Sequence, residues 1–168
     1  HPDMTATNLH KSTDLDERFS QVRNKYDEFL AEGILKRDET PNLYIYRQIK
    51  AGHAFTGIIG AVSVDDYQSG KIKIHEKTIA KREETFVQYL DITKINAEPV
   101  LLMARDSKTI DDIIAEKTRE RPEYDFTTTN KVHHQFWVLD DTASIEAIAE
   151  AYRGHDAFYI ADGHHRSS

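Results

Sequence analysis

The chain has 168 residues, of which 39% are hydrophobic and 30% charged, and its formal net charge is −7. That length can bury a hydrophobic core, and the acidic balance argues against nucleic acid as a partner, because binding a polyanion requires many lysines and arginines. No apolar run of about 18 residues predicts a membrane span and no leader predicts export, so the expected location is the cytoplasm. The absence of cysteine excludes disulfides, thiolate metal sites and a cysteine nucleophile.

The first half of the chain predicts a helix and then a hairpin. Residues 13–31 place apolar side chains at three- and four-residue steps, which is the stripe of an amphipathic helix. Residues 43–49 and 53–65 are rich in β-forming side chains and lie on either side of Ala51-Gly52, so they predict a β-hairpin. A turn, a short strand and a charged helix are then expected at 68–70, 71–74 and 78–90.

The second half alternates strands with helices. Strands are expected at 99–104, 134–139 and 157–161, and helices at 107–116 and 142–152. The polar, proline-containing segment 118–131 is expected to be a long surface loop. Interleaved elements of both kinds predict an α/β or α+β fold with a mixed sheet. We treat residues 1–168 as a single domain and expect it to be a fragment, truncated at both ends, of a longer protein.

The last predicted strand runs into Asp162, Gly163, His164, His165, Arg166 and Ser167. A glycine between strand and helix lets the backbone approach a ligand closely, and the first N–H groups of the next helix favour an anion. Arg166 can clamp phosphate oxygens with two N–H groups, and the two histidines can donate further hydrogen bonds. The alternative is a simple Asp-Gly turn that carries solvated histidines.

A second cluster, His75-Glu76-Lys77-Thr78, lies where another predicted strand meets a helix. A carboxylate beside a phosphate site is a reasonable general base for a hydroxyl that attacks phosphorus, so Glu76 with His75 is the catalytic candidate. Thr78 can cap the helix or contact phosphate. The charged residues 81–84 that follow are best explained as a solvated helix face.

Four segments carry a resemblance to an uncharacterised bacterial family, the domain-of-unknown-function family "ten-fifteen". They are His-Glu-Lys-Thr at 75–78, Tyr-Ile-Ala-Asp-Gly-His-His-Arg at 159–166, Gly-Ile-Ile-Gly-Ala-Val-Ser-Val-Asp-Asp-Tyr at 57–67 and Ile-Asn-Ala-Glu-Pro-Val at 95–100. The likeness covers nearly the whole chain. It implies that an N-terminal segment and a long C-terminal part of the family pattern are absent from it.

The paired motifs are also similar to those of a wider superfamily that contains ParB-type partition proteins, sulfiredoxins and free-serine kinases. That resemblance implies a ParB/sulfiredoxin-like fold in which the glycine-and-arginine corner binds nucleotide phosphates. Sulfiredoxins carry cysteine directly after the motif glycine, where this chain has His164, so their chemistry is excluded. Free-serine kinases match best and imply Glu76 as the base toward a serine hydroxyl, although their two motifs lie closer together than 76 and 163.

Three further features have simpler explanations than a functional site. His133-His134 would point to opposite faces of a strand, so we expect no transition-metal site there. Asp65-Asp66 either holds Mg²⁺ or forms part of a turn, and turn chemistry is the commoner role. Trp137 is expected in the core.

The sequence therefore predicts a nucleotide-binding phosphotransferase that uses ATP or ADP, or else CTP, with Mg²⁺. The expected partner is a small hydroxyl compound, with free L-serine as the first candidate acceptor. Two alternatives remain open at this point: a ParB-like nucleotide-gated partition or DNA-binding protein, and a nucleotide-binding module without catalysis. The oligomeric state is not determined by these patterns.

Overall fold

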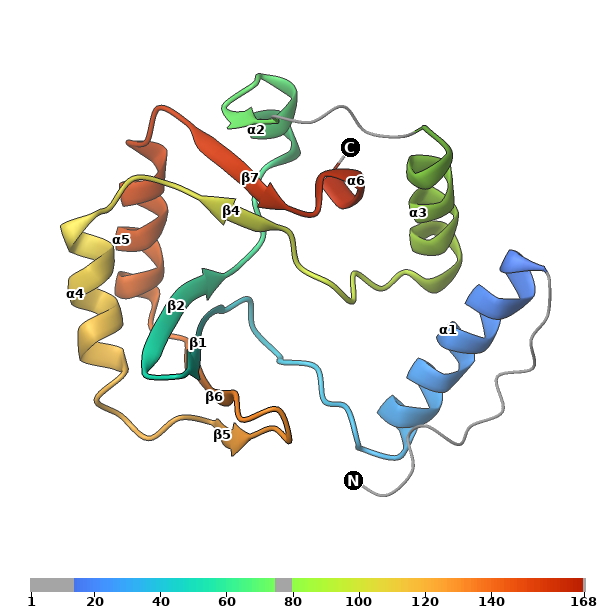
Figure 1. The fold of residues 1–168 in the computed structure, drawn as a ribbon, viewed down its shortest axis with the longest axis horizontal. Helices are drawn as coiled ribbons and strands as arrows, with labels where there is room; N and C mark the ends of the chain where they lie inside the picture. The colour runs from blue at the N-terminus through green and yellow to red at the C-terminus, as the bar shows by residue number, and fades with distance from the viewer. Residues whose placement is uncertain (1–13, 75–79, 168) are drawn as a thin grey trace. The chain divides into compact units, whose positions relative to one another are not determined.

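The computed structural model describes residues 14–74 and 80–167, apart from the side chains of Lys81, His165 and Ser167. Its fold is α+β, with one antiparallel and one mixed sheet (Figure 1). The elements in chain order are α1 Leu15–Ala31, β1 Leu43–Lys50, β2 His53–Ile59, α2 Val64–Gln68, β3 Ile72–Lys73, α3 Ala80–Thr93, β4 Leu101–Met103, α4 Lys108–Lys117, β5 Tyr124–Thr127, β6 His133–Leu139, α5 Thr142–Arg153, β7 Phe158–Asp162 and α6 His164–Ser167.

The described residues form two compact units. Unit 1 is built from three separate stretches of chain, which are the described parts of 1–37, 76–101 and 162–168. Unit 2 contains 38–75 and 102–161 in their described parts. None of the helices in the described ranges has the length and apolar character that a bilayer crossing requires.

The antiparallel sheet of unit 2 has the strand order β2-β1-β6-β5. Its β1–β2 hairpin turns at Ala51 and Gly52, whose φ angles are 49° and 80°. Two consecutive positive φ values are typical of the tight turns that match the twist of paired strands, so the predicted hairpin is confirmed.

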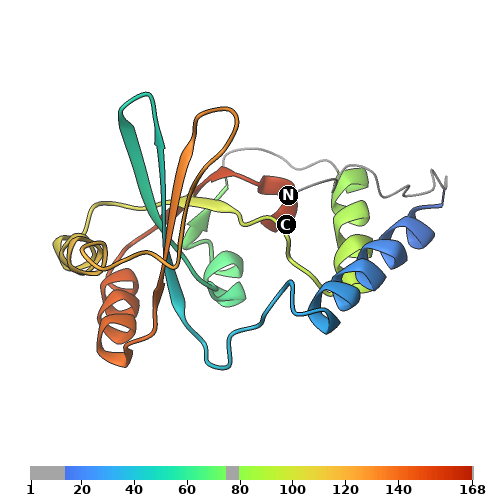
Figure 2. The same ribbon diagram turned by 90° about the horizontal axis from the view of Figure 1, so that it is seen from below.

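One face of this sheet forms the core of unit 2. Ile45 pairs with Trp137 and Leu43 with Leu139, and α4 and α5 cover that face of the sheet (Figure 2). Trp137 is 2% exposed, which confirms the expected core position, and its indole N–H donates to the carbonyl of Glu120 at 3.0 Å. Burial of such side chains provides most of the driving force for folding.

The opposite face of the antiparallel sheet is aromatic. Tyr46 pairs with Phe136, and the ring of His134 stacks between those of Tyr46 and Phe126 at centroid distances of 6.0 and 5.0 Å. Phe126 and Tyr124 on the edge strand β5 are more than half exposed. Cross-strand ring contacts of this kind stabilise the pairing of neighbouring strands.

The second sheet has the order β3-β7-β4. Ile72 of β3 pairs in parallel with Phe158 of β7, whereas the arrows of β7 and β4 point in opposite directions in Figure 1. The sheet is therefore mixed, as predicted. β7 leads directly into Gly163 and α6, so this strand determines where the glycine-and-arginine motif begins.

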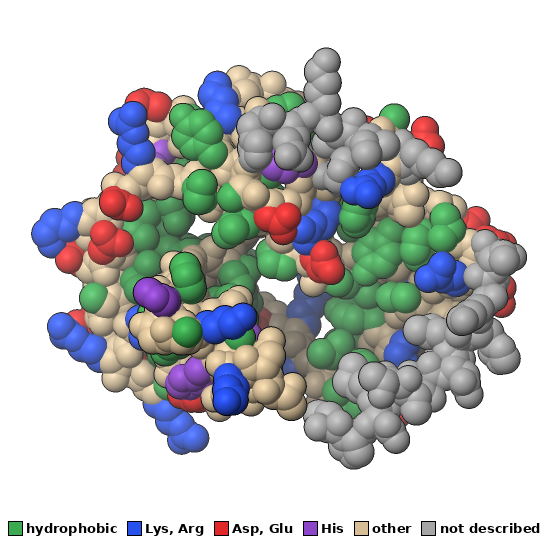
Figure 3. Space-filling view, in the orientation of Figure 1, with side chains coloured by type: hydrophobic (Ala, Val, Ile, Leu, Met, Phe, Trp, Pro, Cys, Tyr) green, Lys and Arg blue, Asp and Glu red, His purple; other side chains and the backbone are tan. Residues whose placement is uncertain are grey.

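Unit 1 pairs helix α1 with helix α3. Phe19 and Tyr89 meet edge to face at 5.3 Å, and Arg23 donates to the carbonyl of Thr93 at 3.1 Å. Hydrophobic side chains gather in the region of these two helices in Figure 3. α1 begins at the N-cap Asp14, whose carboxylate accepts from the N–H of Asp16, and this supports the helix predicted for residues 13–31.

Two predicted elements differ from the structure. The strand expected over 53–65 ends at Ile59, because Ser63 caps a new helix, α2, through a hydrogen bond from the N–H of Asp65. The loop expected over 118–131 contains strand β5, which pairs with β6. All four residues of β5 are exposed, so the segment lies on the surface without being a loop.

Candidate functional site

The glycine-and-arginine corner comprises residues 162–167 and lies in unit 1. Gly163 follows β7 with a φ of 92°, a left-handed conformation that side chains disfavour. The next residue begins the four-residue helix α6, which contacts α3. The predicted change from strand to glycine to helix is therefore present.

The guanidinium of Arg166 lies directly against Gly163. A Cβ atom added to this glycine would be 3.1 Å from Nε and Nη2 of Arg166 and 3.2 Å from its Cζ. Any side chain at position 163 would therefore push against the guanidinium, and the backbone geometry would be strained as well. The corner requires glycine for both reasons.

Arg166 is held by two carboxylates and a carbonyl. Its Nη1 donates to Glu98 at 2.7 Å and to the carbonyl of Pro99 at 3.3 Å, and its Nη2 donates to Asp162 at 3.0 Å. The arginine side chain is 17% exposed, whereas each carboxylate side chain is 74% exposed. The cation is therefore fixed in position by partners that water reaches, and each such surface pair contributes about 0–1 kcal/mol.

The histidines of the corner do not behave alike. His164 is only 8% exposed, so the alternative of two solvated histidines is wrong for this residue. The side chains of His165 and Ser167 lie outside the description, and so do the whole residues His75, Glu76 and Thr78. The structure therefore brings together Asp162, Gly163 and Arg166 from the predicted set, and it leaves the second motif untested.

Sequence reasoning missed Glu98, the partner that Arg166 holds across 68 positions of the chain. In the sequence, Glu98 stands out only as part of the segment 95–100 that resembles the family pattern. An acidic residue directly before a proline gives no signal of its own, because nothing in its neighbourhood indicates a distant arginine.

The two neighbouring histidines in β6 point to opposite faces, as predicted. His133 donates to Asp125 at 2.6 Å, and this hydrogen bond is the main cause that holds the pKa of the Asp125 carboxyl below its ordinary value. His134 instead lies 2.7 Å from the hydroxyl of Tyr46. Within the described residues, no three metal-ligating side chains converge.

Asp65 and Asp66 occupy the first turn of α2, where acidic side chains favour the positive end of the helix dipole. The pair was expected to hold Mg²⁺ or to form part of a turn, and it instead lies in the first turn of a short helix.

The charges over the helices α4 and α5 of unit 2 are mixed in sign on the face that Figure 3 shows. Lysines and arginines over α4 and α5 alternate with acidic side chains in Figure 3. Several of them form pairs three or four residues apart, such as Lys108 with Asp112 and Arg153 with Glu150. Interspersed charges of this kind do not favour a polyanion.

The family model described as "Protein of unknown function (DUF1015)" covers residues 3–168. No curated protein and no solved structure matches the chain.

Proposed function

The chain belongs to the family described as "Protein of unknown function (DUF1015)". For this chain we propose, from its own residues and the geometry of the Gly163 corner, the function of a nucleotide-binding phosphotransferase. The Gly163 corner binds the phosphates of ATP or ADP with Mg²⁺, and the phosphoryl group passes to a small hydroxyl compound. Free L-serine is the first acceptor to test, and CTP is the other nucleotide to include.

The contact between Gly163 and Arg166 carries this proposal. A positive-φ residue followed by helical residues turns consecutive backbone N–H groups toward one side, which is the geometry of an anion-binding concavity. The guanidinium of Arg166 lies beside that backbone, 3.1 Å from where a Cβ of residue 163 would be. Its planar set of N–H groups can bind two phosphate oxygens at once. Arginine has five N–H donors, and three hydrogen bonds to described residues leave donors for phosphate oxygens.

The carboxylates around Arg166 suit a magnesium nucleotide better than a free phosphate. Asp162 and Glu98 are both largely exposed and would repel an uncompensated polyphosphate. Mg²⁺ in nucleotide sites is held by one or two carboxylates together with the phosphates, and it keeps several waters. Asp162 and Glu98 are the residues of this corner that would hold it, and the ion would neutralise charge on the transferring phosphoryl group.

The catalytic half of the proposal rests on the His75-Glu76 motif and on its resemblance to free-serine kinases. Glu76 acts as the general base that takes the proton from the acceptor hydroxyl. The ParB-like alternative requires a basic surface, and the interspersed charges over α4 and α5 do not support one. If Glu76 has no catalytic role, the alternative function is a nucleotide-binding module without catalysis.

The test is a calorimetric titration of the protein with ATP, ADP and CTP in the presence of Mg²⁺. Replacing Arg166 with alanine removes charge-assisted hydrogen bonds worth about 1.5–3 kcal/mol, so affinity should fall about 10- to 100-fold. Arg166→Lys keeps the positive charge but loses the planar guanidinium, so its nucleotide affinity should lie between those of wild type and Arg166→Ala. Arg119→Ala is the matched control, because Arg119 also forms an ion pair, with Glu116, in an exposed position.

Affinity equal in wild type and Arg166→Ala would remove the corner from nucleotide binding. No binding of any of the three nucleotides by the wild-type protein would end the proposal as a whole.

A further inference from the structure

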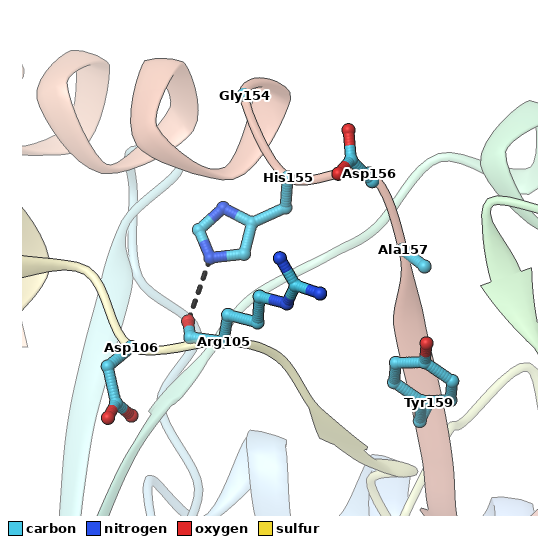
Figure 4. A pocket seen from close by; sticks show the side chains of 7 residues that line it. All are labelled: Arg105, Asp106, Gly154, His155, Asp156, Ala157 and Tyr159. Carbon is cyan, nitrogen blue, oxygen red and sulfur yellow. Dashed lines mark hydrogen bonds between the residues drawn. The ribbon is translucent and has the colours of Figure 1, made fainter.

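A second candidate site lies in unit 2. It is a cavity of about 240 Å³ between the segment after β4 and the segment that joins α5 to β7 (Figure 4). We call it the Arg105 pocket. Its lining residues are Arg105, Asp106, Gly154, His155, Asp156, Ala157 and Tyr159.

The guanidinium of Arg105 is the charged group that faces this cavity. Figure 4 shows it extending between His155 and Tyr159, toward β7, while the carboxylates of Asp106 and Asp156 point away from it. Among the described residues, this guanidinium has neither a hydrogen bond nor an ion pair. Its five N–H donors are thus available to a ligand.

The backbone beneath Arg105 is fixed by His155. The ring nitrogens of His155 lie 2.7 Å from the carbonyl oxygen of Ala151 and 2.8 Å from that of Arg105. The same ring stacks on Phe158 at 5.7 Å. One side chain thereby connects the end of α5, the start of β7 and the residue that carries the cation. A wall anchored in this way reduces the ordering cost of binding.

The size and charge of the pocket select the ligand. A volume of 240 Å³ is below the range of about 300–1,000 Å³ that holds drug-sized molecules, so a small ligand fits. Arg105 supplies one positive charge, and the negatively charged Asp106 and Asp156 line the same pocket, so a monoanion suits it better than a dianionic phosphate. Tyr159 is 53% exposed and lines the same pocket, so its ring can offer an apolar surface to the ligand.

We propose that the Arg105 pocket binds a small organic monocarboxylate, with the carboxylate on the guanidinium of Arg105 and the apolar part against Tyr159. A guanidinium and a carboxylate can form two parallel hydrogen bonds. Such a site therefore selects its ligand by geometry as well as by charge. All the residues that line the pocket belong to unit 2, and the proposal does not rest on the proposed phosphoryl transfer.

Benzoate is a suitable probe, with benzamide as its uncharged isostere and inorganic phosphate as the competing anion. Each is titrated into the ¹⁵N-labelled protein at constant ionic strength, and amide shifts of residues 154–159 report binding at the pocket. We expect saturable binding of benzoate at millimolar concentration or below, at least about tenfold weaker binding of benzamide, and weaker binding of phosphate than of benzoate.

Two variants test whether Arg105 supplies the positive charge that binds benzoate. Arg105→Gln should lower benzoate affinity about 10- to 100-fold, to the level of benzamide, and Arg105→Lys should lower it less. The matched control is Arg153→Gln, since Arg153 is an exposed arginine close by in sequence whose side chain pairs with Glu150 and does not line the pocket.

Three results would overturn the proposal. They are no saturable shift at residues 154–159 with benzoate, equal affinity for benzoate and benzamide, and tighter binding of phosphate than of benzoate. A benzoate affinity that Arg105→Gln leaves unchanged would also exclude it, because the cation would then play no part.

Discussion

Replacing Gly163 with alanine tests the geometry on which the candidate nucleotide site depends. At a φ of 92°, an alanine pays about 1–2 kcal/mol for its left-handed backbone. Its Cβ would also lie 3.1 Å from Nε of Arg166, so the guanidinium has to move by a few tenths of an ångström. That movement weakens the ion pairs of Arg166 with the exposed carboxylates of Glu98 and Asp162. It adds at most about 1 kcal/mol to the cost of the substitution.

The expected loss in free energy of unfolding is therefore about 1–3 kcal/mol, measured by urea denaturation followed by circular dichroism. Gly33→Ala is the matched control. Gly33 lies in the same unit, has a φ of 71°, and would place its Cβ with no atom within 4 Å. It should show the backbone cost of about 1–2 kcal/mol without the contact.

A double-mutant cycle with Arg166→Ala separates the two contributions. When the guanidinium is absent, the cost of Gly163→Ala should fall to that of Gly33→Ala. A Gly163→Ala variant as stable as wild type would refute the backbone argument. A cost that does not depend on the residue at position 166 would refute the contact between glycine and arginine.

Two further predictions concern other parts of the chain. Asp141→Ala should lower the free energy of unfolding by about 0.5–2 kcal/mol, because Asp141 caps α5 by accepting from the N–H of Ser144 at 2.8 Å, while the neighbouring Asp140→Ala serves as control. That hydrogen bond lowers the pKa of the Asp141 carboxyl below its ordinary 3.8, so the difference from wild type should be largest at pH values well above 3.8 and should shrink as the pH falls through the lower folded-state pKa. A difference that does not shrink in more acidic solution contradicts the prediction. Glu76→Gln should lower kcat for phosphoserine formation from serine and ATP or ADP about 10²- to 10⁴-fold with nucleotide affinity nearly unchanged, and a variant as fast as wild type would exclude Glu76 as the base.

The elements with a clear period could be predicted from the sequence. The stripe over 13–31 gave α1 to within two residues at its start, and Ala51-Gly52 located the hairpin. The helix α2 was missed because its first residue, Val64, extends an apolar run that begins in β2. Ser63 followed by Asp65-Asp66 was the available signal, since a hydroxyl cap before acidic residues marks a helix start.

Strand β5 was missed for a different reason. Tyr124, Asp125, Phe126 and Thr127 alternate aromatic and polar side chains, which is a strand pattern, but four residues in a polar segment give a weak signal. The strand is stabilised mainly by its pairing with β6, where the ring of Phe126 stacks on that of His134. Edge strands of this kind depend on partners that a pattern along one segment cannot reveal.

The candidate site was predictable in its local part only. The order Asp162, Gly163, helix indicates a left-handed glycine before a helix, and the structure has one. The carboxylate of Glu98 on the guanidinium of Arg166 depends on tertiary structure, and no spacing rule joins two residues so far apart. The burial of His164 likewise depends on tertiary structure and could not be predicted from the neighbouring sequence.

The three-segment origin of unit 1 affects the order in which the chain acquires structure during its synthesis. All four strands of the antiparallel sheet have left the ribosome once Leu139 has emerged, so that sheet can form while later residues are still being added. Arg166 reaches Glu98 only after a loop of 68 positions closes, which is slow compared with forming a hairpin. The corner at Gly163 is therefore among the last parts of the described chain to form, and a ribosome that stalls before Arg166 leaves Glu98 without its arginine.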